Sequence, residues 1–117
     1  MQREGSISES HMEEGWIKVG CLADVDENDT RSVTIDGRPV CLYNLDGEIF
    51  ATDAKCTHGD ADLSLGIVLD SRLIECPLHE GSFDIKTGRA VGPPCTQDLR
   101  CHSVKVEQGV IYVRVSD

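Results

Sequence analysis

The stretch "RSVTIDGRPVCLYNLDGEIFAT", residues 31–52, decides the fold class. β-branched and apolar residues form short runs in it, and the pairs Asp36-Gly37 and Asp46-Gly47 separate these runs. Glycine in such a pair accepts the positive φ that a tight hairpin turn requires. The stretch therefore predicts antiparallel strands joined by two hairpins.

The same pattern continues on both sides of this stretch. Runs that alternate apolar and polar residues or carry β-branched clusters are typical of strands, and Gln108-Gly109 separates the last two of them. These runs are WIKVG (16–20), RLIEC (72–76), SVKVE (103–107) and VIYVRV (110–115). Nothing predicts a helix longer than a turn or two. We therefore predict an all-β fold of antiparallel sheets.

The length of 117 residues suits one compact domain with a core of its own. Residues 1–14 are polar and have no hydrophobic period, so we predict a disordered tail followed by a single domain over 15–117.

The charge of the chain restricts its partners. Asp and Glu number 21 against 11 Lys and Arg, for a formal net charge of -10, so a phosphate backbone or an anionic membrane surface would be repelled. No run approaches the roughly 20 apolar residues needed to span a bilayer, and no apolar signal segment is evident at the start. We expect no nucleic acid or membrane partner and a cytoplasmic location.

Two short segments carry the chemistry. The first is Cys56-x-His58, and after seventeen further residues comes Cys76-x-x-His79. Each segment offers one thiolate and one imidazole, which is the donor set of a two-iron, two-sulfur cluster with cysteines on one iron and histidines on the other. We predict that Cys56 and Cys76 hold the inner iron and that His58 and His79 hold the outer iron.

The residues around these segments suit such a cluster. Gly59 and Gly81 allow the backbone to approach closely and to offer N–H groups to the cluster sulfurs. Pro77 stiffens the second segment. The sequence "GPP" at 92–94 predicts a rigid loop that covers one side of the site.

Two other interpretations use the same residues. A structural zinc module would take two cysteines and two histidines without any redox role. A thiol enzyme would use Cys76 beside His79, but no third orienting residue is evident. The remaining cysteines are interpreted as buried small hydrophobic residues: Cys21, Cys41, Cys95 and Cys101.

The two segments resemble a known family. Cys56-Thr57-His58-Gly59, followed by Leu63-Ser64 and Gly66, is similar to the first ligand loop of the Rieske-type ferredoxins of bacterial aromatic-ring dioxygenase systems. The second loop and the residues after it resemble the same family at Cys76-Pro77-Leu78-His79, Gly81, Phe83, Thr87-Gly88 and Pro93-Pro94. The resemblance runs from about Trp16 to the end of the chain.

The resemblance implies a Rieske-type fold. Its base, a β-sandwich or barrel, would comprise residues 15–54 and 93–117, with a cluster-binding lobe inserted at 55–92. It also implies one Rieske 2Fe-2S cluster per chain and a carrier of single electrons that is not itself an enzyme. The expected partners are an NADH-dependent flavoprotein reductase and a terminal oxygenase, and the expected state is a monomer.

The sequence departs from the Rieske proteins of respiratory chains. The respiratory proteins have two further cysteines, one in each ligand loop, that form a disulfide. The corresponding positions here are Ala61 and Leu78, so this disulfide cannot form. Gly81 and Phe83 replace a serine and a tyrosine that donate hydrogen bonds toward the cluster. Fewer donors predict a potential toward the low end of the Rieske range of about -150 to +300 mV. A Rieske small subunit of another oxidoreductase, such as a nitrite reductase, is the alternative.

Overall fold

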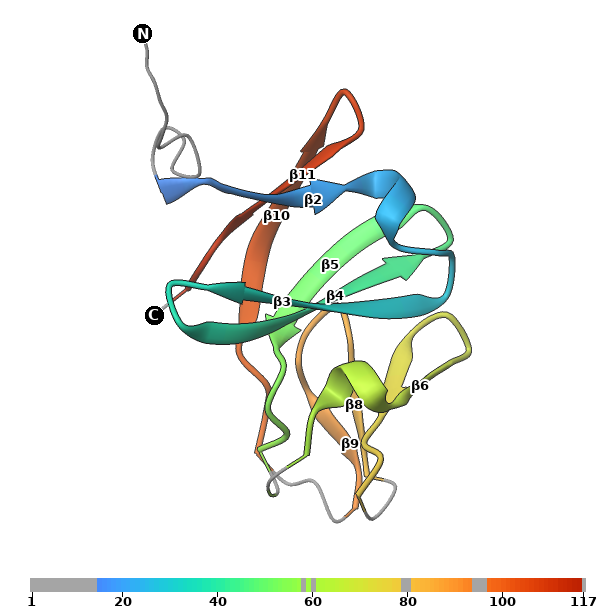
Figure 1. The fold of residues 1–117 in the computed structure, drawn as a ribbon. Helices are drawn as coiled ribbons and strands as arrows, with labels where there is room; N and C mark the ends of the chain where they lie inside the picture. The colour runs from blue at the N-terminus through green and yellow to red at the C-terminus, as the bar shows by residue number, and fades with distance from the viewer. Residues whose placement is uncertain (1–14, 58, 60, 79–80, 94–96, 117) are drawn as a thin grey trace, which may run out of the picture.

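The computed structural model describes residues 15–57, 59, 61–78, 81–93 and 97–116, which form two antiparallel sheets (Figure 1). The six-stranded sheet has the order β2-β11-β10-β5-β4-β3 and the four-stranded sheet the order β6-β7-β8-β9. The strands of the first sheet are β2 (Ile17–Cys21), β3 (Asp29–Ile35), β4 (Arg38–Leu45), β5 (Glu48–Asp53), β10 (Cys101–Glu107) and β11 (Val110–Arg114). Those of the second are β6 (Ile67–Leu69), β7 (Leu73–Glu75), β8 (Ser82–Asp84) and β9 (Ala90–Gly92). The prediction of an all-β antiparallel fold is confirmed.

The hairpins turn where the sequence predicts them. Both residues of Asp36-Gly37, Asp46-Gly47 and Gln108-Gly109 have a positive φ, with values from 51° at Asp36 to 97° at Gly47. This is the backbone of a two-residue type I′ turn, whose twist matches that of the strands it joins. The turns fix the register of β3 with β4, β4 with β5, and β10 with β11.

Strand β4 is buried on both faces and separates two hydrophobic cores. Because side chains alternate along a strand, Val40 and Leu42 point to one core, while Cys41, Tyr43 and Leu45 point to the other. We call the first the base core, and its buried members are Val25, Ile35, Val40, Leu42, Ile49, Ala51, Ile111 and Val113. We call the second the lobe core, and its buried members are Cys41, Tyr43, Leu45, Ala54, Cys56, Leu63, Ile74, Cys76, Phe83, Ile85 and Leu99.

Polar contacts also fasten the four-stranded sheet to the base. The hydroxyl of Ser71, in the β6-β7 turn, donates to Asn28 Oδ1 at 2.9 Å. Thr30 Oγ1, on β3, donates to the carbonyl of Ser64 at 2.7 Å. Ser64 lies in the 3-10 helix η4 (Leu63–Leu65), which precedes β6. The lobe core and these bonds hold the second sheet in a fixed orientation on the first.

The one described histidine, His102, has a structural role on β10. Its side chain is fully buried, and Nδ1 accepts the backbone N–H of Ser116 at 3.0 Å. An acceptor nitrogen carries no proton, so Nε2 carries it and donates to Asp53 Oδ1 at 2.9 Å. Arg38 donates to the Ser116 carbonyl at 3.1 Å. These bonds attach the end of the chain to the six-stranded sheet.

The structure differs from the sequence predictions at two points. The sequence predicts loops for the two ligand segments. Within and after these segments the structure also has three strands of three residues each, β6, β8 and β9. The prediction that Cys21 is buried is wrong, because it is exposed at the end of β2. The segment Leu22–Asp24 forms one turn of 3-10 helix, η3. Among the described residues, no helix has the length and apolar character needed to cross a membrane.

Candidate metal centre

The two ligand segments fold into similar loops. In the first, the backbone N–H of Cys56 donates to the carbonyl of Ala61 at 3.0 Å. In the second, the N–H of Cys76 donates to the carbonyl of Gly81 at 2.7 Å. Each loop therefore begins at its cysteine and is closed by a hydrogen bond to the residue five positions later. The sequence pattern predicts a paired arrangement of this kind, although the cysteine-to-histidine spacing differs between the loops.

The lobe core holds both cysteines at the inner ends of these loops. Cys56 and Cys76 are each 1% exposed, and they lie in one cluster with Leu63, Ile74 and Phe83. Burial raises the pKa of the Cys76 thiol, while the backbone N–H of Leu78 lowers it and the adjacent Cys56 thiol raises it further. Two thiols thus meet in an apolar site where thiolates would need a cation.

The outer parts of the two loops also meet. A Cβ placed on Gly59 would lie 3.6 Å from Cδ2 of Leu78, so the Leu78 side chain of the second loop lies beside Gly59 of the first. Thr57 Oγ1 donates to the carbonyl of Gln97 at 2.7 Å, which ties the first loop to the segment that follows the prolines. The segment at Gln97 thus adjoins the first ligand loop, and the covering role of residues 92–94 stays a prediction.

Half of the predicted ligand set cannot be placed. His58 and His79 lie outside the described residues, as do Pro94 and Cys95. The thiol pair fits the cysteine half of a Rieske cluster. The histidine half stays a prediction that rests on the sequence.

The other described cysteines have no neighbours of this kind. Cys41 is fully buried on β4, and burial raises its pKa to about 12, so it is a neutral thiol. Cys101, at the start of β10, is half-buried, and burial raises its pKa as well. None of the five described cysteines forms a disulfide, and only Cys56 and Cys76 come together from two loops.

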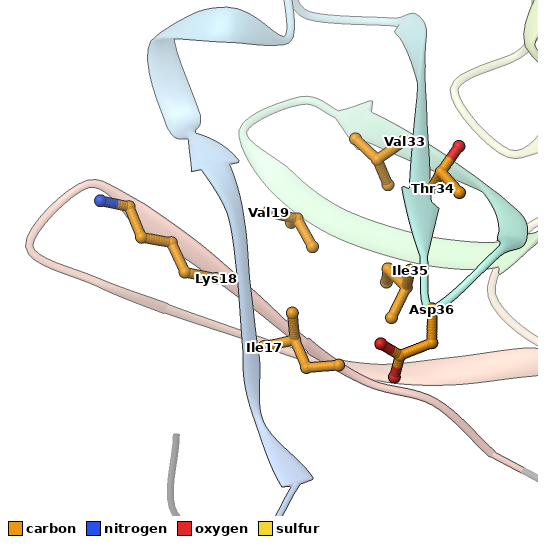
Figure 2. Close-up of a pocket in the computed structure, with 7 residues that line it drawn as sticks. All are labelled: Ile17, Lys18, Val19, Val33, Thr34, Ile35 and Asp36. Carbon is orange, nitrogen blue, oxygen red and sulfur yellow. The ribbon is translucent and has the colours of Figure 1, made fainter. Parts of the chain in front are cut away.

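A groove of the described part lies away from the two ligand loops. It has a volume of about 410 Å³ and separates β2 from β3, the two outer strands of the six-stranded sheet. Ile17 and Val19 face Val33 and Ile35 across it (Figure 2). No thiol, histidine or ligand loop lines this groove, so we do not regard it as part of the metal centre.

Comparison with known proteins decides the family. Residues 15–103 match the Rieske [2Fe-2S] domain. The chain belongs to the Rieske family. The ferredoxin component of the naphthalene 1,2-dioxygenase/salicylate 5-hydroxylase systems of a Ralstonia species is 47% identical over 104 residues, which are 89% of this chain and 99% of the relative. The ferredoxin component of a Pseudomonas aeruginosa naphthalene 1,2-dioxygenase system is 45% identical over 90% of this chain and its own full length.

Solved Rieske ferredoxins share the fold. The ferredoxin of carbazole 1,9a-dioxygenase from Nocardioides aromaticivorans superposes with a TM-score of 0.84 at 28% identity and covers 88% of this chain and 100% of its own. A ferredoxin in complex with the oxygenase of a carbazole 1,9a-dioxygenase superposes with a TM-score of 0.81 at 38% identity, over 86% of this chain and 94% of its own.

These relatives settle the class of the Rieske chain. It is a ferredoxin component of the dioxygenase type, an electron carrier rather than an enzyme, and its cofactor is a Rieske 2Fe-2S cluster. The relatives are ferredoxin components, and they favour this function over a subunit of a nitrite reductase. The zinc and thiol-enzyme interpretations are thereby set aside.

Proposed function

We propose that Cys56, His58, Cys76 and His79 bind one cluster and that the chain delivers single electrons to a terminal aromatic-ring oxygenase. The donor would be an NADH-dependent flavoprotein reductase, which oxidises NADH by two electrons and releases them one at a time. The observation that carries the ligand assignment is the pair of loops closed in the same way, with their cysteines buried side by side. We further propose that the carrier is a monomer in the cytoplasm.

Each part of the site has a defined contribution. When bound, the cluster supplies reversible uptake of one electron. The lobe core excludes water from Cys56 and Cys76, and the N–H of Leu78 is directed at the Cys76 sulfur, a contact of the kind that tunes a cluster potential. The Leu78 side chain lies beside Gly59, so the residue that precedes His79 and the residue that follows His58 are neighbours.

The partner is expected to dock where these loops meet. Electron transfer requires a short path and a brief contact, so the docking area should be small and the complex weak. Leu78 is 40% exposed beside the ligands, and Pro93 is exposed on the covering loop. The oxygenase selects the aromatic substrate, so the residues of this chain do not indicate which substrate it is.

Replacement of Leu78 by lysine tests the docking position. We expect reduction of the oxygenase to slow about tenfold, because one desolvated apolar contact is replaced by a charge. Rapid mixing of the reduced carrier with the oxidised oxygenase measures the rate, and the visible spectrum shows whether the cluster is intact.

Val106→Lys is the matched control, since Val106 is also 40% exposed but lies on β10. Equal rates for the two variants would show that Leu78 does not contact the oxygenase on docking. Loss of the cluster in Leu78→Lys alone would instead assign the side chain to packing between the two loops.

A further inference from the structure

A row of exposed apolar side chains lies beside the ligand loops on one edge of the four-stranded sheet. Leu65, Ile67 and Leu69 are 74%, 59% and 36% exposed. Ile67 and Leu69 alternate with the half-buried Val68 on β6 and so face the same side, and Leu65 is exposed at the end of η4, two residues before Ile67. We call these three residues the β6 ridge. The described part of the chain has six large hydrophobic residues that are exposed, and half of them form this ridge.

The register of the sheet shows what surrounds the ridge. Ile67 lies opposite Glu75, and Leu69 lies opposite Leu73, in the β6-β7 ladder. Directly opposed residues share a face, so the carboxylate of Glu75 borders Ile67. Val68 points the other way and packs against the lobe core. The ridge thus belongs to the solvent face of the sheet, where the fold gains nothing from apolar side chains.

Carboxylates outnumber cations near the ridge. Glu75 lies opposite Ile67, Asp70 follows Leu69, and Asp62 caps η4. The cations nearby are Arg72 in the β6-β7 turn and Lys55, which lies opposite Asp62 in an isolated β-bridge. Arg72 is already within 4.0 Å of Asp84. An apolar strip with this border matches a partner surface on which an apolar groove is flanked by lysine and arginine.

The ridge is held rigidly. Leu63, at the start of η4, is fully buried, and its N–H donates to the carbonyl of Ala54 at 2.7 Å. Asp62 Oδ1 accepts the N–H of Ser64 at 2.9 Å and caps this helix. Gly66 lies so close to the carbonyl of Glu75 that a Cβ there would overlap it. A surface ordered before binding loses little conformational entropy on docking.

The ridge is also continuous with the ligand loops. The first loop closes at Ala61, one residue before the cap of η4, and β7 runs directly from the ridge hairpin into Cys76. Figure 1 shows β6 at one side of the part of the molecule that holds β8 and β9. A partner that docks on the loop ends can therefore reach the ridge as a second contact.

We propose that the β6 ridge is a second docking contact for the terminal oxygenase and is received there by an apolar groove flanked by basic residues. The inference rests on the proposed function. Any partner that exchanges electrons must approach the ligand loops, whereas a contact to one side is free to differ between partners and so gives specificity. The oxygenase is chosen because a similar ferredoxin forms a complex with its oxygenase.

A second copy of this chain is a poorer occupant. A symmetric dimer would place the same surface on both sides of the interface, so the carboxylates of Asp62, Asp70 and Glu75 in one copy would face the same set in the other. Like charges brought together in this way oppose association. The net charge of -10 acts in the same direction.

Ile67→Thr and Leu65→Gln test the proposal separately. Threonine keeps the β-branched shape of isoleucine on β6, and both side chains are mainly in solvent, so the visible spectrum and thermal midpoint should match the wild type. We expect each change to raise the dissociation constant for the purified oxygenase about five- to tenfold, because each removes one interface hot spot. The KM for the carrier should rise equally, with kcat unchanged. Val106→Thr, an equivalent change on β10, should alter none of these values.

The reductase reaction and the oligomeric state separate the outcomes. Reduction of the carrier by the reductase should be the same for the wild type and both variants. Unchanged dissociation constants, or equal losses with oxygenase and reductase, would overturn the proposal. A wild-type dimer that Ile67→Thr converts to a monomer would overturn it in favour of a second copy. A wild-type carrier that never reduces the oxygenase would instead contradict the proposed function.

Discussion

Replacement of Cys76 by alanine is expected to remove the cluster and with it all electron transfer. Cys76 is 1% exposed within the lobe core, beside the Cys56 thiol. Without its thiolate the inner iron lacks one of its two cysteine ligands, and a bound cluster contributes to the folding free energy of the lobe. Iron content should fall from two per chain to near zero, and transfer to the oxygenase should fall more than about a hundredfold.

Cys41→Ala provides the matched control. Cys41 is equally buried and lies in the same core, but on β4 rather than in a ligand loop. The removal of one buried sulfur should cost some stability through the small cavity it leaves, while the iron content stays near two. Iron analysis and the visible spectrum of both variants decide the matter. A cluster lost from both variants would point to core packing, and a cluster retained in Cys76→Ala would contradict the ligand assignment.

Gly88→Ala is expected to destabilise the protein most among substitutions outside the ligand loops. Gly88, in the β8-β9 turn, has a φ of +80°, which costs an alanine about 1 to 2 kcal/mol. A Cβ there would also overlap the backbone carbonyl of Leu99 and lie 2.9 Å from the Cys101 sulfur. The overlap with a backbone atom adds about 2 kcal/mol, for a total of about 3 to 4 kcal/mol. The melting temperature should fall by about 12 to 20 °C.

Gly109→Ala isolates the overlap from the backbone strain. Gly109 has a φ of +77°, and nothing lies within 4 Å of the position that a Cβ would take there, so only the strain should be felt. Its melting temperature should fall by about 5 to 10 °C. Calorimetry of the cluster-loaded proteins compares the two variants. Equal decreases in melting temperature would show that the backbone at Leu99 can move away from an added Cβ at Gly88, so that the overlap costs nothing.

Much of the base could be predicted from the sequence because its signals are local. The pairs Asp36-Gly37, Asp46-Gly47 and Gln108-Gly109 require positive φ, and that requirement fixes the hairpins whatever the tertiary context. The long strands β4 and β10 carry enough residues for their β character to be recognised. The two Cys and His segments likewise indicate a candidate site by residue type and spacing, and the structure brings Cys56 and Cys76 together there.

The second sheet could not be predicted in the same way. Strands β6, β8 and β9 have three residues each, too few for alternation to be distinguished from a loop. Their pairing depends on the lobe core, which collects residues from distant parts of the chain. The exposure of Ile67 and Leu69 is not predictable for this reason, since "IVL" at 67–69 is an apolar run that does not distinguish a buried side from an exposed one.

The double burial of β4 also depends on tertiary structure. Its sequence, with six consecutive residues buried from Val40 to Leu45, has no polar face to indicate which side meets solvent. Only the second sheet, packed against Cys41, Tyr43 and Leu45, explains the pattern. The prediction for Cys21 is wrong in the opposite direction: Val19 and Leu22 on either side of it pack against the base core, while Cys21 itself is exposed at the end of β2.

The central claim is that this chain carries a cluster ligated by Cys56, His58, Cys76 and His79. Iron and labile-sulfide analysis of the purified protein, with the EPR spectrum after dithionite reduction, tests it most directly. We predict two irons and two sulfides per chain and a reduced signal whose average g value lies below that of ferredoxins with four cysteine ligands. A signal typical of an all-cysteine cluster, or one zinc without sulfide, would contradict the account.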